Sequence, residues 1–273
     1  MIPFFRKIRY KQAQGNQPAS PAGRFLKYSR YALGEILLVM IGILLALQVN
    51  NWNEDRKDRA QEQVLLKQLQ TEFKSNLEQL EEKIELRHEF INSAAKLLSY
   101  IDVPETRIKD SINRHIALSI GYTTFDPIVS DLASSGGLKL LRNNRLKQLL
   151  SYWRSEIIQV TESEQTWYKY RNEIYVPFLI KHYQLRTSRH ELIKTDYLKK
   201  FQADKGIDSY LFSIGGIGRS KYPEDYNHLL NEPDFEDHLT RCIVTNNICD
   251  VQSQILRSRI IEILELLSKE IHD

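Results

Sequence analysis

The chain has 273 residues, of which 42% are hydrophobic and 27% are charged, a balance that fits one large or two small folded domains. The mean hydropathy of -0.43 excludes a protein built mainly of membrane spans. The two cysteines are too few for a disulfide-stabilised scaffold, and the net charge of +3 is unevenly distributed.

The chain begins with a short basic head. Residues 1–30 carry seven cations and no carboxylate, namely Arg6, Lys7, Arg9, Lys11, Arg24, Lys27 and Arg30. Residues 1–11 mix these cations with apolar side chains, which suits either a segment lying in the lipid headgroup layer or a disordered cytoplasmic tail. Residues 12–23 have the Gly, Pro and Ser content of a flexible linker.

Residues 31–52, YALGEILLVMIGILLALQVNNW, form the long apolar run of the chain. About 20 apolar residues in a helix cross a hydrocarbon core of ~30 Å, so we predict a transmembrane helix here. A cleaved signal peptide is the alternative, but Leu45-Ala46-Leu47-Gln48 is a poor cleavage site. We therefore expect an uncleaved signal anchor.

The residues that flank this helix predict its orientation. Tyr31 and Trp52 bracket the run as interfacial aromatics do, and Arg24, Lys27 and Arg30 lie beside it on the N-terminal side. Cations concentrate on the cytoplasmic side of membrane spans. We expect a single-pass protein of the inner (cytoplasmic) membrane, with a cytoplasmic head (1–30), a transmembrane helix (31–52) and a periplasmic or otherwise extracytoplasmic domain (53–273).

The sequence predicts a series of helices over residues 53–273. Three-four spacing of apolar residues predicts helices over 53–101, 106–121, 143–186, 190–203 and 234–272, and Asp126-Pro127 reads as a further helix start. Pro104 should end the first of these and Pro177 should kink the helix over 143–186. No stretch alternates with period two. We predict an all-α fold in which the transmembrane helix continues into an elongated helical bundle with coiled-coil character.

Several segments resemble a known family. MIPFFRKIR, PAGRFLKY and YALGEILLVMIGILLALQVNNWNEDRK resemble the N-terminal signature of membrane proteins from Bacteroidota-type bacteria that share a domain of unknown function. SDLASSGGLKLLRNNRLKQLLSYW resembles that family's recurrent helix, Ser-Gly turn and helix. The resemblance implies one N-terminal span and a helical extracytoplasmic domain. It implies no activity and no catalytic residues.

Two features of the span have functional interpretations. An ionisable residue such as Glu35 inside a span suggests a proton relay in an ion-driven machine, although near the cytoplasmic end it can also reach the headgroups or pair with Arg30 or Lys27. Gly34, Gly42 and Ala46 lie on one side of the helix, where small residues let spans pack closely. That face suggests self-association.

The body offers weaker candidates. Glu85 and His88 have the Glu-x-x-His spacing of helix-bundle metal sites, and Asp225 and His228 form a near second copy, but a solvated surface is the simpler interpretation. Gly215-Gly216-Ile217-Gly218 follows no strand and lacks a phosphate-binding partner.

Aromatic residues at helical spacing indicate core packing before ligand stacking. This group comprises Tyr152, Trp153, Trp167, Tyr168, Tyr170, Tyr175 and Phe178. Cys242 and Cys249 are seven positions apart on one predicted helix, ~10.5 Å by helical rise, so they should not bond each other. Buried free thiols are the simpler expectation, and a bond between subunits is the alternative.

No catalytic arrangement of side chains stands out. We predict a non-enzymatic binding, scaffold or oligomerising protein of the cell envelope, with the lipid bilayer and a second copy or another envelope protein as partners. We expect no cofactor, no bound metal and no nucleic acid, and the sequence names no small-molecule ligand. The alternative is a single-span subunit of an ion-motive-force machine that uses Glu35.

Overall fold

The structure is a computed structural model that describes residues 21–129, 137–194 and 217–272, with side chains described over 32–129, 137–193 and 217–272. The chain divides into two compact units, 1–60 and 61–273. Within the described ranges the protein contains helices and no strands, which confirms the all-α prediction.

The first unit contains the apolar part of α2, the helix Pro21–Asp102. From Ala32 onward this helix is long and apolar enough to cross a membrane, and none of its most apolar window is buried. The helix passes through residues 48–58 without a break, as predicted. It ends at Asp102, two residues before Pro104, which opens the short helix η1 (Pro104–Thr106).

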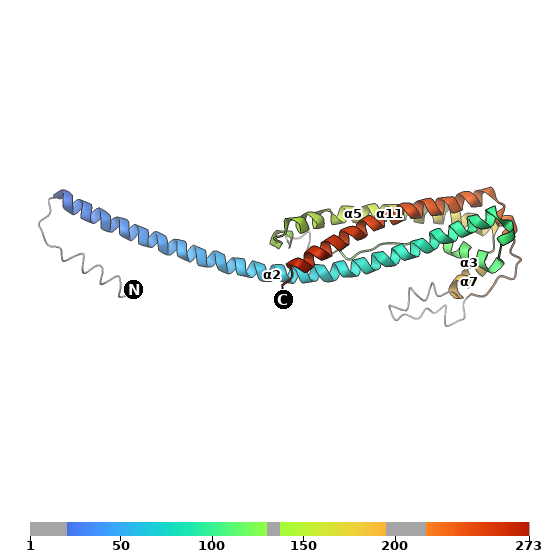
Figure 1. The fold of residues 1–273 in the computed structure, drawn as a ribbon, viewed down its shortest axis with the longest axis horizontal. Coiled ribbons are helices and arrows are strands. Elements are labelled where there is room, and N and C mark those ends of the chain that lie inside the picture. The colour runs from blue at the N-terminus through green and yellow to red at the C-terminus, as the bar shows by residue number, and fades with distance from the viewer. Residues whose placement is uncertain (1–20, 130–136, 195–216, 273) are drawn as a thin grey trace. The chain divides into compact units, whose positions relative to one another are not determined.

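The second unit packs three long helices and several short ones (Figure 1). The long ones are the C-terminal part of α2, α5 (Asn144–Tyr170) and α11 (Pro233–Glu270). The short ones are α3 (Lys109–Ser119), α4 (Gly137–Leu140), the π-helical turn η3 (Arg171–Tyr175), α6 (Val176–His182), α7 (Leu185–Lys194) and α10 (Tyr226–Leu230).

Local sequence accounts for several of these boundaries. Asn143 caps α5 by accepting a hydrogen bond from the backbone N–H of Leu146. Pro233 opens α11, where its missing N–H costs nothing. Pro177 lies in the first turn of α6 directly after the π turn, because proline cannot donate the helical hydrogen bond four residues back.

The predicted helix start at Asp126-Pro127 is wrong. Residues 121–129 are not helical, and their backbone pairs with side chains of α2 instead. The Gln79 amide exchanges two hydrogen bonds with the backbone of Asp126, at 3.1 and 3.0 Å, and the Asn76 amide does the same with Ile128, at 2.9 and 2.8 Å. These tertiary hydrogen bonds satisfy the backbone outside a helix and override the capping signal.

Other boundaries differ in detail. The helix predicted to reach residue 186 ends at His182, and the one predicted over 190–203 begins at Leu185; its part beyond residue 194 lies outside the described residues. The predicted apolar face of the helix over 106–121 is buried at Ile112, Ile116 and Ile120, but Ile108 is exposed because it caps α3 from outside.

The core of the second unit contains two large apolar clusters and a small third one formed by α3 and α7. One includes Leu66 and Phe73 of α2, Trp153 of α5 and Ile260 of α11. The other includes Leu97 of α2 with residues of α3, η3, α6 and the first half of α11. All three long helices contribute to both large clusters, since Trp167 of α5 belongs to the second one.

Candidate functional site

The span candidates all lie on the exposed surface of α2. Gly34, Glu35, Gly42 and Ala46 are exposed, and a Cβ added at either glycine would meet nothing within 4 Å. The face predicted for helix packing is therefore open within the chain. Trp52 is exposed as well.

The N-terminal flank is described only in its backbone. Arg24, Lys27, Arg30 and Tyr31 belong to α2, but their side chains lie outside the described part of the structure. Their roles at the membrane interface, and that of Glu35, stay predictions.

A buried ion pair lies between the two large apolar clusters. Arg87 of α2 and Glu164 of α5 lie 2.8 Å apart, with side chains 0% and 2% exposed. The Arg87 guanidinium also donates to Ser253 of α11 at 2.8 Å and to Thr123 at 3.1 Å. Glu164 accepts from the Thr123 hydroxyl and the backbone N–H of Phe125, both at 2.7 Å.

This network joins the three long helices and the segment after α3 at one level of the bundle. Arg87 and Glu164 are sealed from solvent, so they position elements of the fold and do not meet a ligand. Sequence reasoning missed the pair, because Arg87 stands in a run of surface charges and only the helical phase of Ile84 and Phe90 hints that it faces inward.

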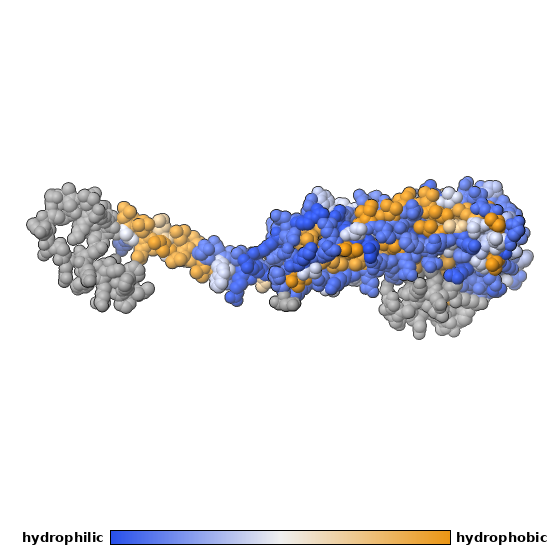
Figure 2. All heavy atoms as spheres, viewed as in Figure 1, coloured by the Kyte–Doolittle hydropathy of each residue, from blue (hydrophilic) through white to orange (hydrophobic). Residues whose placement is uncertain are grey.

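The outer face of α11 carries a second apolar stripe, which we call the α11 seam: Val244, Ile248, Val251 and Ile255. Each of these side chains is between 49% and 62% exposed. Their spacing of four, three and four residues is that of a coiled-coil seam, and all four are β-branched. Figure 2 shows apolar residues gathered along the part of the body where α5 and α11 run.

The neighbours of the seam on α11 are polar, and the exposed cation Arg241 lies one turn before Val244. Asn247 and Gln254 are exposed beside the seam, and the carboxylate within the same stretch, Asp250, is engaged by His88 of α2 at 3.1 Å. Sequence reasoning recognised the inner stripe of α11 and missed the outer one, although the heptad spacing was readable in the sequence.

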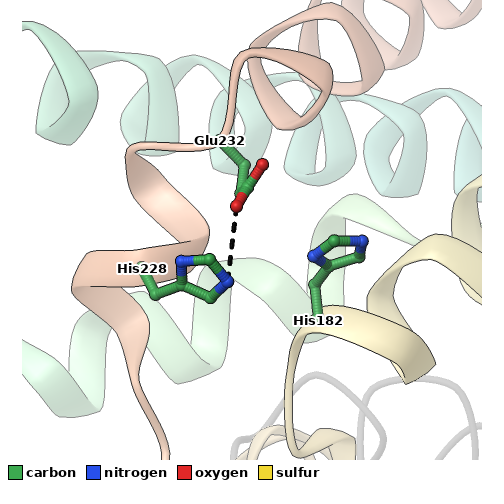
Figure 3. Close-up of side chains that lie close together, drawn as sticks. All are labelled: His182, His228 and Glu232. Atoms are coloured by element: carbon green, nitrogen blue, oxygen red, sulfur yellow. Dashed lines mark ion pairs between the residues drawn. The ribbon is translucent and has the colours of Figure 1, made fainter.

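Three potential metal ligands meet where α6 ends and α11 begins (Figure 3). His182 is the last residue of α6, His228 lies in α10, and Glu232 directly precedes α11. One ligand atom from each lies within 4.8 Å of the others, and His228 Nε2 is 3.3 Å from Glu232 Oε1. The His228–Glu232 spacing was visible in the sequence, whereas only the fold brings His182 to them.

The metal motif considered from the sequence does not assemble. Glu85 and His88 lie on the exposed side of α2, and His88 pairs with Asp250. Asp225 acts instead as the N-cap of α10, accepting from the backbone N–H of His228 at 2.9 Å. Of the Gly-rich segment, Gly215 and Gly216 lie outside the described residues.

Most of the aromatic cluster serves the core, as expected. Trp153, Trp167 and Tyr175 are buried, and Trp167 donates from Nε1 to the Gly121 carbonyl at 2.7 Å. Tyr152 and Tyr168 are exposed.

Both cysteines are buried, and the chain forms no bond between them, as the spacing predicted. Burial raises the pKa of the Cys249 thiol to about 11, and burial also raises the pKa of Cys242. Neither thiol is disposed to react with solvent reagents.

The fold and these surfaces define an all-helical protein with one apolar N-terminal helix that is able to span a membrane. The chain belongs to a family of unknown function: the model described as Family of unknown function (DUF6090) matches residues 35–199. No curated protein and no solved structure matches the chain.

Proposed function

We propose that the protein is a membrane-anchored, non-enzymatic scaffold of the cell envelope that self-associates through the α11 seam. The seam carries this proposal, because four β-branched side chains at heptad spacing stand half exposed on a helix whose inner face already packs in the core.

A second copy of the chain is the occupant that suits this surface best. A symmetric dimer brings the same patch from both subunits together, so each residue must tolerate a copy of itself or of its neighbours. Val and Ile do so, and the amides of Asn247 and Gln254 beside them bring no like-charge repulsion.

The size of the seam favours association that is assisted by anchoring. From Val244 to Ile255 the helix rises only ~17 Å. A face that short buries less than the ~800 Å² per partner of a standard interface. Confinement of two copies to one membrane raises their effective concentration, which compensates for a small contact area.

The anchor and its orientation complete the proposal. The apolar helix from Ala32 onward, the basic residues before it and the resemblance of residues 1–60 to bacterial membrane proteins support a single span with the N-terminus in the cytoplasm and the body outside it. Reporter fusions test this directly. Alkaline phosphatase fused after residue 273 should be active, and a cytoplasmic reporter fused there should be inactive; the reverse result would overturn the orientation.

Substitution within the seam tests the self-association. Ile248→Asp places a charge at the centre of the proposed contact and, because the side chain is exposed, should leave the helical body folded. We expect the full chain to migrate as a dimer in native membranes after chemical cross-linking, and Ile248→Asp to be monomeric. Ser75→Asp, an exposed position of α2, is the matched control and should remain dimeric.

Glu35 provides the competing interpretation, a subunit of an ion-motive-force machine. Under the scaffold proposal, Glu35→Gln leaves dimerisation and every phenotype of the cell unchanged at any proton-motive force. A Glu35→Gln phenotype that follows the proton-motive force would favour the competing function.

A further inference from the structure

We propose that His182, His228 and Glu232 form a Zn²⁺ site that ties the end of α6 to the junction of α10 and α11. His182 is distant in the sequence from His228 and Glu232, yet one potential ligand atom from each of the three lies within 4.8 Å of the other two. In Figure 3 a ring nitrogen of His182 faces the side of His228 that pairs with Glu232.

The donor set matches zinc chemistry. Two imidazoles and one carboxylate are a recurrent three-ligand set for zinc, with a water or another ligand completing the tetrahedron. The hard cations Mg²⁺ and Ca²⁺ prefer all-oxygen sites, so two histidines argue against them. The side chains of His228 and Glu232 are 55% and 29% exposed, which leaves a route for a fourth ligand from solvent.

The distances are close to those of a bound metal. With zinc–ligand bonds of about 2.0–2.2 Å, neighbouring ligand atoms of a tetrahedron lie roughly 3.3–3.6 Å apart. The 3.3 Å between His228 Nε2 and Glu232 Oε1 already equals one such edge. The His182 ring needs to approach by no more than roughly 1.5 Å, which is within the reach of a side-chain rotation.

The surroundings hold the ligands in place before a metal arrives. Phe178 stacks on the His182 ring, with centroids 4.5 Å apart and planes at 23°. Arg107 anchors α10 by donating to Asn227 at 2.9 Å and to Asn231 at 3.2 Å. Support of this kind reduces the entropy that metal binding has to overcome.

An ordinary surface pair is the alternative. His228 and Glu232 are four residues apart, so their contact also suits a His–Glu ion pair without a metal. Such a pair makes no use of His182. The effect of His182 on zinc binding therefore separates the two interpretations.

The test uses the full chain in detergent micelles, purified with a tag that contains no histidine. Metal content after dialysis against Zn²⁺ gives the stoichiometry, and competition with a chromogenic chelator gives the affinity. We expect one Zn²⁺ per chain and at least a tenfold loss of affinity in each of His182→Gln, His228→Gln and Glu232→Gln. Zn²⁺ should also raise the thermal midpoint of the wild type and not of these variants.

His88→Gln is the matched control, since His88 is an exposed histidine that also pairs with one carboxylate, Asp250. It should bind Zn²⁺ like the wild type. Co²⁺ in place of Zn²⁺ should give the intense visible absorption of a tetrahedral site. Unchanged affinity in His182→Gln, or loss of affinity in His88→Gln to the same extent as in the three site variants, would overturn the proposal.

Discussion

Removal of the Arg87 guanidinium should be among the most destabilising single changes in the body. The Arg87–Glu164 pair is 2.8 Å long and its side chains are 0% and 2% exposed, so water screens it little. Arg87→Met keeps the aliphatic stem but leaves Glu164 charged and buried. Breaking a buried ion pair at one partner costs about 3–5 kcal/mol.

The hydrogen bonds that remain place the expected loss near the lower end of that range. Glu164 keeps the Thr123 hydroxyl and the Phe125 N–H, both at 2.7 Å, which partly stabilise its charge. We therefore expect Arg87→Met to lower the free energy of unfolding by about 3 kcal/mol. The double variant Arg87→Met/Glu164→Leu should lose less than the sum of the two single variants, because it leaves no unpaired charge.

Urea unfolding of the full chain in micelles, followed by far-UV circular dichroism, measures these differences. Arg257→Met is the matched control, since Arg257 pairs with Glu81 at 2.6 Å but the two side chains are 40% and 44% exposed. An exposed pair is worth about 0–1 kcal/mol. A loss of under about 1 kcal/mol in Arg87→Met, or equal losses in Arg87→Met and Arg257→Met, would refute the reasoning.

Three further predictions concern the packing and titration of the body. Gly121→Ala should lower the free energy of unfolding by about 1–3 kcal/mol, because the added methyl group would collide with the buried ring of Phe90. Urea unfolding measures this loss, and an unchanged urea midpoint would contradict the close packing. Burial, with help from neighbouring cations, lowers the pKa of His115 from 6.5 to about 4, so its contribution to stability is fully present above pH 6.5 and is lost as the pH falls toward 4. Between pH 6.5 and 4, the free energy of unfolding of His115→Gln should therefore fall less than that of the wild type. If the two proteins lose stability equally over this pH range, the acid sensitivity belongs to other groups. A maleimide should label neither Cys242 nor Cys249 in the folded chain and both in urea, and rapid labelling of the native protein would contradict their burial.

Local signals predicted the parts of the fold that depend on neighbouring residues. Asn143 and Pro233 mark helix starts by the backbone chemistry of their own positions, and Pro104 marks a helix end in the same way. Asp126-Pro127 carries an equally good local signal, yet side chains of α2 capture that backbone. Sequence spacing cannot weigh such tertiary hydrogen bonds against a cap.

The candidate sites also differ in whether local spacing or tertiary contacts form them. The α11 seam depends only on heptad spacing within one helix. The sequence alone therefore contains the signal for this outer apolar stripe as well as for the inner one. Arg87 looks like one charge among many until its partner Glu164 is brought to it from α5. The approach of His182 to His228 likewise depends on how the chain returns after α6, which no spacing in the sequence encodes.

Cross-linking of a single introduced cysteine in native membranes tests the proposed self-association most directly. Val251→Cys places one accessible thiol at the middle of the α11 seam, while the two native thiols are buried. A short bismaleimide reaches between two such thiols whether the helices pair parallel or antiparallel. We predict a covalent dimer for Val251→Cys and a monomer for Ser75→Cys, which lies exposed on α2. A monomer for Val251→Cys, or equal dimer yields at the two positions, would contradict a dimer formed through α11.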